Sequence, residues 1–176
     1  MFIAVLSIFG LAAPIRGAPP VVRCEIEVDR AAPAPRVEPI RHLVADAAAI
    51  VRVRVVAPAD SAAATREVRV TVLEDLKSPT AQRVPRTFAV RGALVARDDY
   101  NPLPVPYAQV RRAGLRGTCF AEEYRAGAEY LLLLAQPTPG QWTPYWAPLM
   151  PTTEQIHGAD DAWVAWVRAQ LAAVKR

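Results

Sequence analysis

The residue types that could carry out chemistry are few in this sequence, and they are scattered. The histidines are His42 and His157, and Ser61 and Ser78 are the only serines after residue 18. Neither serine lies in the Gly-x-Ser-x-Gly setting of a nucleophile elbow. The sequence also lacks a phosphate-binding loop, an HExxH pair and a zinc-ligand spacing. We therefore predict no catalytic residues, no metal ligands and no cofactor, and we expect a protein that is not an enzyme.

Adjacent carboxylates offer two weaker possibilities. Glu122 and Glu123 could form an acid/base pair, but neighbours on a strand point to opposite faces and would not converge. We expect both at the surface beside a turn. Asp98 and Asp99 could bind a cation, yet two carboxylates without regularly spaced partners fall short of a calcium site.

Asp98 and Asp99 belong to a long segment, 95–117, that shows no regular pattern. It contains the run Asp98-Asp99-Tyr100-Asn101 followed by several prolines and glycines. A loop of this length in a compact domain is either functional or poorly ordered. Asp98, Asp99, Tyr100 and Asn101 are thus our candidate interaction loop.

The N-terminus predicts export. Residues 2–13 are almost wholly apolar, which is close to the length of a signal-peptide core and too short to span a bilayer. We expect a signal peptide over 1–18, a secreted or periplasmic protein, and no transmembrane segment once the leader is removed. Residues 19–39 should form an extended arm and a Pro/Ala-rich linker, and 40–176 a single domain.

Cys24 and Cys119 are the only cysteines, and both lie beyond the leader. An even pair in an oxidising compartment suggests one disulfide between them. Two buried free thiols are the alternative.

Periodicity indicates the elements that must position these residues. Residues 40–49 and the stretch from Asp160 onward have helical spacing, whereas residues 50–56 alternate apolar and charged residues as a half-exposed strand does. Tyr130 to Leu134 is apolar without a break, so it predicts a strand buried on both faces, with Gly127 in the preceding turn. The remaining strands are expected at 24–28, 67–76, 87–94, before Gly127 and at 141–147, and 148–158 is expected to be a connector.

Short antiparallel strands between two helices favour a mainly β fold. We predict a small closed OB-type barrel of five or six strands, with a short N-terminal helix and a C-terminal helix. The aromatic residues Trp142, Tyr145, Trp146, Trp163 and Trp166 should pack the helix on the barrel rather than form a ligand cage.

The chain has 176 residues, is 52% hydrophobic and has a net charge of +4. This composition permits a real core, and the mild positive charge, supplied almost entirely by arginine, does not by itself indicate nucleic-acid binding.

These elements resemble the netrin-like domain family, which includes the tissue inhibitors of metalloproteinases. The matching parts are Cys24 before a short helix, the run Ala45 to Val53, the strand Val70 to Lys77, Gly117-Thr118-Cys119 and Gly127 to Leu131. The likeness is strongest to bacterial secreted proteins of this type with no assigned role, and it implies an OB-type barrel. In the inhibitors, an N-terminal cysteine chelates the protease zinc. Here no plausible cleavage makes Cys24 the first residue, so the resemblance does not extend to zinc chelation.

Three functions follow as hypotheses. The first is a non-catalytic interaction module with an unknown protein partner in the envelope or outside the cell. The resemblance implies the second, an inhibitor of metalloproteases. The third is oligonucleotide binding, which OB-type barrels often perform, although we do not expect it here.

Overall fold

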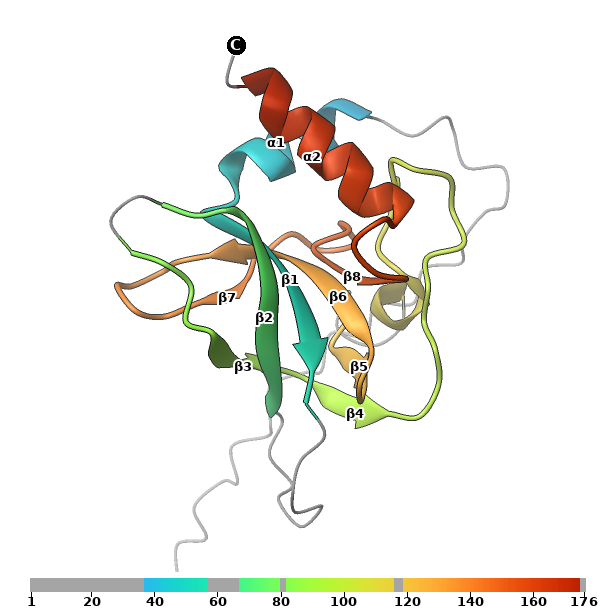
Figure 1. Cartoon of the computed structure of the whole chain (residues 1–176). Helices are drawn as coiled ribbons and strands as arrows, with labels where there is room; N and C mark the ends of the chain where they lie inside the picture. Colours follow the sequence, from blue (N-terminus) through green and yellow to red (C-terminus); the bar gives the residue numbers. More distant parts are fainter. Residues whose placement is uncertain (1–36, 57–66, 80–81, 116–118, 175–176) are drawn as a thin grey trace, which may run out of the picture.

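The computed structural model describes residues 37–56, 67–79, 82–115 and 119–174. It confirms the predicted fold class: a mainly β protein with a nearly closed antiparallel barrel and two helices (Figure 1). The predicted leader over 1–18, the arm over 19–39 and Cys24 lie outside the described residues.

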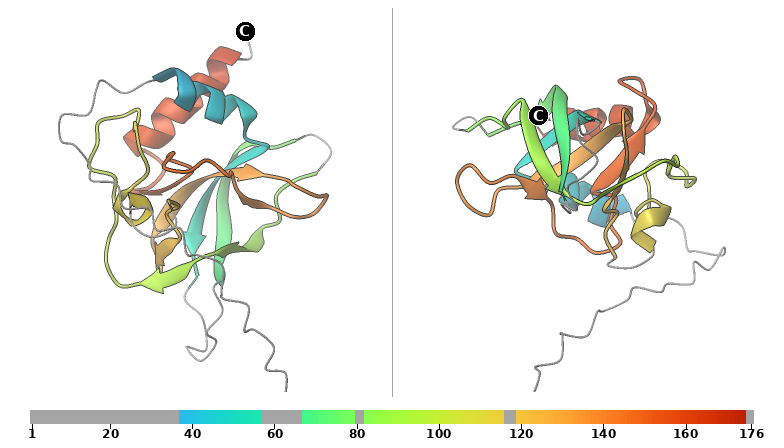
Figure 2. Two further views of the ribbon diagram at one scale, coloured as in Figure 1. Left: turned by 180° about the vertical axis from the view of Figure 1, so that it is seen from behind. Right: turned by 90° about the horizontal axis from the view of Figure 1, so that it is seen from below.

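The barrel sheet has the strand order β3-β2-β1-β6-β7, with all neighbours antiparallel. Figure 2 shows the strands from below, curling round a common interior. An additional strand, β8, pairs with β6, and β4 and β5 form a separate parallel pair. The bounds are β1 Ala49–Val55, β2 Glu67–Lys77, β3 Thr87–Arg91, β4 Ala93–Val95, β5 Glu123–Arg125, β6 Glu129–Ala135, β7 Thr143–Pro144 and β8 Thr153–Ile156.

The strand β6 is buried on both faces, as its unbroken apolar run predicts. Leu132 and Leu134 point into the barrel interior, where they pack with the inward valines of β1 and β2. Leu131 and Leu133 point to the opposite face and pack against the two helices. The chain therefore builds two cores on the two sides of one strand.

The helices α1 (Val37–Asp46) and α2 (Ala162–Val174) lie together at one end of the barrel (Figure 1). Each helix presents an apolar stripe to Leu131 and Leu133. Trp163 belongs to the stripe of α2 and is fully buried in this core. Asp161 is the N-cap of α2, because its carboxylate accepts a hydrogen bond from the Trp163 backbone N–H at 2.8 Å. No described helix has the length and apolarity needed to cross a membrane.

Three expectations about the elements need correction. The strand expected over 87–94 breaks at Gly92, which has φ of 154° and separates β3 from β4. The expected connector over 148–158 contains β8, whose four residues are all buried. The segment 95–117, expected to be a loop throughout, begins with the last residue of β4, Val95, and contains a 3-10 helix, η1 (Arg112–Leu115), near its end.

Candidate functional site

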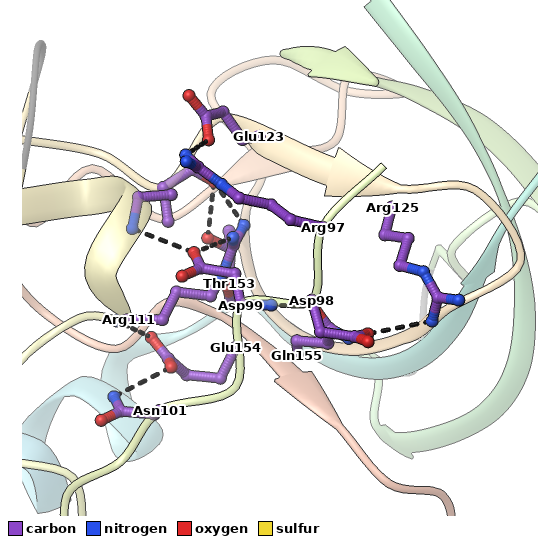
Figure 3. Close-up of polar contacts among 12 residues, drawn as sticks. Arg97, Asp98, Asp99, Asn101, Arg111, Glu123, Arg125, Thr153, Glu154 and Gln155 are labelled. Atoms are coloured by element: carbon purple, nitrogen blue, oxygen red, sulfur yellow. Dashed lines mark hydrogen bonds and ion pairs between the residues drawn. The ribbon is translucent and has the colours of Figure 1, made fainter. Parts of the chain in front are cut away.

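The candidate interaction loop lies against a buried polar network (Figure 3). Arg111 is the centre of this network, and its side chain has no solvent exposure. The guanidinium donates to the Asp99 carboxylate at 2.8 Å and to the carbonyl oxygens of Thr153 and Ala121 at 2.7 and 2.9 Å. Its central carbon lies 5.5 Å from the Tyr124 ring centroid. A buried guanidinium with this many acceptors is held in one position.

Glu154 is a further buried carboxyl group of the network, beside Asp99. Its carboxylate accepts hydrogen bonds from the Arg111 backbone N–H at 3.1 Å and from the Asn101 side-chain amide at 3.0 Å. Burial raises the pKa of Glu154 to about 7, although the positive charge of Arg111 acts in the opposite direction. Both oxygens are used within the fold, so this carboxylate does not face a substrate.

The four loop residues therefore divide into two pairs. Asp99 and Asn101 are buried and bond to the chain's own groups. Asp98 is half exposed and pairs with Arg125 at 2.9 Å, while the Tyr100 ring stacks on His157 with a centroid separation of 3.7 Å. A surface role for the loop stays a prediction, and it now depends on Asp98 and Tyr100.

Glu122 and Glu123 do not converge, which agrees with the expectation from strand geometry. Glu122 pairs with Arg91 at 3.2 Å, and Glu123 pairs with Arg97. Among the described residues, no group of three or more His, Cys, Asp or Glu side chains could hold a metal ion. Cys119 is described and has φ of 67°, but the Cys24–Cys119 pairing stays a prediction because Cys24 lies outside the described residues.

A pocket of about 300 Å³ opens where the two end strands of the sheet, β3 and β7, approach without pairing. We call it the seam pocket. Its floor is formed by the barrel core, including Tyr124 and Trp142, and its lining is mainly apolar. The Arg91–Glu122 ion pair lies at its edge. Other lining residues include Ala89, Val90, Phe120, Ala121, Thr143, Tyr145, Trp146 and Thr153.

Trp146 stands at this pocket with 75% of its surface exposed. Its indole stacks on the Phe120 ring, with a centroid separation of 4.0 Å and an angle of 27° between the planes. The expectation that all five aromatic residues pack the helix on the barrel is thus wrong for Trp146, and it is wrong for Trp142, which packs in the barrel interior. Trp163 and Trp166 of α2 and Tyr145 pack between the helices and the sheet, as expected.

The buried network positions one wall of the seam pocket. Ala121 and Thr153, whose carbonyls bind the Arg111 guanidinium, both line the pocket, and so does Tyr124. Burial raises the pKa of Tyr124 to about 12, so its phenol stays neutral at physiological pH. Sequence reasoning missed both the pocket and Arg111, because Arg111 lies in a segment without pattern and its partners are 10 to 43 residues away.

Comparison with protein-family models, with curated proteins and with solved structures finds no match for this chain.

Proposed function

We propose that the protein is a secreted or periplasmic, non-catalytic interaction module that binds a protein partner through the seam pocket. One observation carries the proposal: an open apolar pocket lies beside an exposed tryptophan that is stacked on Phe120. Tryptophan is enriched among the residues that dominate binding energy at protein interfaces, and pockets that receive an anchor side chain are mainly apolar. A stacked ring also loses less freedom on binding than a mobile one.

Binding is preferred to catalysis because of where the charged groups are. Arg91 and Glu122 line the pocket but are paired with each other, and Glu154 bonds to Arg111 and Asn101 inside the network. None of these three groups is positioned as a free acid or base toward the pocket.

Oligonucleotide binding is a poorer fit to the outer face of the barrel. Arg52 and Arg54, the arginines that alternate along β1, both bond to Glu129, and Arg52 also bonds to Glu74. These cations are already neutralised by carboxylates and are poorly placed to bind phosphates. Salt-dependent binding of single-stranded DNA to the purified protein would contradict this choice.

The test uses the mature protein, Trp146→Ala and the matched control Val174→Ala, which changes an exposed apolar residue at the end of α2. Proteins captured from envelope extract are identified, and each candidate is purified and titrated directly. The proposal expects a partner whose affinity falls about 30-fold or more with Trp146→Ala, the loss expected of an interface hot spot, and stays unchanged with Val174→Ala. A partner that binds all three proteins equally would overturn the role of the pocket.

Inhibition of metalloproteases is measured with the same three proteins against a panel of purified enzymes. Inhibition that survives Trp146→Ala would support the inhibitor hypothesis and a different surface. Loss of inhibition with Trp146→Ala would identify the protease as the partner.

A further inference from the structure

The seam pocket borders an open strand edge. In the described part of the chain, β3 pairs only with β2. Val90 faces Val68 in that pairing, and the Val72 N–H donates to the Arg86 carbonyl. In an antiparallel ladder, every second residue of a strand forms backbone hydrogen bonds to a given neighbouring strand. Residues 86, 88 and 90 therefore direct their backbone N–H and C=O groups at β2.

Ala89 and Arg91 have the opposite orientation. Their N–H and C=O groups point away from β2, and both residues line the seam pocket. A row of backbone donors and acceptors on a sheet edge is a template for an added strand. The pocket beside it can receive one side chain of that strand.

The stretch after Cys119 leads directly to this edge. Cys119 precedes Phe120, which lines the pocket, and the Glu122 carbonyl accepts a hydrogen bond from the Ala93 N–H at 2.8 Å, just beyond β3. If Cys24 is bonded to Cys119, as the sequence predicts, the residues that follow Cys24 begin beside the pocket.

We propose that this chain's own segment 24–28, which lies outside the described residues, occupies the seam pocket by adding along the open edge of β3. Its sequence alternates Cys24, Ile26 and Val28 with Glu25 and Glu27. An extended segment places the first set on one face and the second on the other. Ile26 then enters the apolar pocket.

Charge and chain length both fit this occupant. The glutamates then face outward on the side of Arg91, whose side chain is 63% exposed at the rim of the pocket and already pairs with Glu122. Eight residues lie between position 28 and Val37, where the described structure begins. The nine steps from residue 28 to residue 37 reach about 30 Å in an extended chain, which is comparable to the diameter of a small domain.

The consequence for binding is competition. A partner that uses the seam pocket has to displace Ile26. The apparent affinity of that partner is therefore reduced by the fraction of molecules in which segment 24–28 occupies the pocket. The inference shares the pocket with the proposed function but concerns contacts within one chain. The two can therefore fail separately.

The test is nuclear magnetic resonance on the oxidised mature protein. The proposal expects nuclear Overhauser contacts between the Ile26 methyl groups and the rings of Phe120 or Trp146. It also expects the Ala89 and Arg91 amides to exchange at least about tenfold more slowly than in Ile26→Asp, because a paired edge opens less often. Val21→Asp, which lies outside the alternating run, is the matched control and should behave as the wild type.

The Val90 amide serves as the internal reference, since it is bonded to β2 and should stay protected in every variant. If the Val90 amide loses its protection from exchange in Ile26→Asp, that variant has disturbed the β2–β3 pairing. The same measurements are then made on Ile26→Ala in its place. The absence of contacts from Ile26 to either ring, together with equal exchange at Ala89 and Arg91 in all variants, would overturn the proposal. Contacts that disappear on dilution would mean that the segment comes from a second copy, which would also overturn it.

Discussion

The Arg111 guanidinium and the Asp99 carboxylate form an ion pair of 2.8 Å in which neither side chain is more than 6% exposed. Such a pair exists in a protein interior only where further hydrogen bonds satisfy both ions. Here the Ala113 N–H also donates a hydrogen bond to Asp99. The backbone carbonyls of Thr153 and Ala121 accept hydrogen bonds from the other two guanidinium nitrogens of Arg111. The pair fixes a long segment to β8 and to the wall of the seam pocket.

Arg111→Leu should destabilise the protein by about 3–5 kcal/mol, because it leaves Asp99 buried without its cation. Arg112→Ala is the matched control: the neighbouring arginine is exposed, and its loss should cost less than about 0.5 kcal/mol. Urea unfolding of both variants measures the difference. Equal stability of the two variants would show that the pair does not hold the segment.

Glu154 should make stability depend on pH in an unusual direction. Its pKa is about 7 in the folded protein, against an ordinary value of 4.5 for a glutamate side chain. The folded state therefore binds more protons between these values, and stability should fall as pH rises from 4.5 to 7, by up to ~3 kcal/mol. Glu74 and Glu129 have lowered pKa values, so their contributions are lost only on further acidification.

Glu154→Gln imitates the protonated side chain and should remove most of this slope. Urea midpoints at pH 5, 6, 7 and 8 for both proteins give the measurement. A wild-type slope that persists in Glu154→Gln would assign the titration to another group.

Gly92→Ala should distort the edge of the seam pocket. A Cβ atom at Gly92 would lie 2.4 Å from the Glu122 carbonyl oxygen and 2.6 Å from the Tyr124 ring, at a φ of 154°. We expect a loss of about 2–4 kcal/mol from overpacking and backbone strain together. Gly127→Ala has positive φ but open space around its Cβ, so it should cost only about 1–2 kcal/mol. Thermal unfolding of the two variants should separate the steric cost from the cost of φ alone.

Export predicts a shortened chain. Protein recovered from the periplasm should lack about its first 18 residues, an estimate from the usual anatomy of a leader. Intact-mass spectrometry reports the new N-terminus directly. Retention of Met1 would contradict export, and with it the oxidising compartment that favours a disulfide.

The Cys24–Cys119 disulfide should stabilise the mature protein by roughly 4–5 kcal/mol, the chain-entropy value for a closed loop of about a hundred residues, less any strain. Denatured, unreduced protein should show no titratable thiol. Cys24→Ser and Cys119→Ser should lower the urea midpoint by the same amount. Reductant should lower the urea midpoint of the wild type and leave the midpoints of the two variants unchanged. Two reactive thiols in the unreduced protein would contradict the bond.

The parts of the fold that could be predicted are those with a regular pattern of apolar residues. The alternation in β1 and β2, the apolar run of β6 and the capped helix α2 each have a local signal, and each is found near its expected position. The strand β8 has no such signal. Its Thr153, Glu154 and Gln155 are polar yet buried, because partners from elsewhere in the chain satisfy their side chains.

The candidate site was unpredictable for a related reason. The seam pocket combines residues from β3, from the stretch around Phe120 and from the stretch around β7, so no single segment of sequence contains it. The exposure of Trp146 depends on the tertiary arrangement of the nearly closed barrel, which no local pattern encodes. Its neighbours Trp142 and Tyr145 are packed into the two cores, and composition alone cannot distinguish the three.

The buried network also sets an order on the way the chain can fold. Arg111 joins groups at positions 99, 121 and 153, so its charge stays hydrated until β8 has been synthesised and has docked on β6. Contacts this distant in sequence form late, since the loops that separate them must close first. A nascent chain that ends before Thr153 lacks one of the carbonyl groups that hold the Arg111 guanidinium, so this wall of the seam pocket is fixed only after β8 has docked.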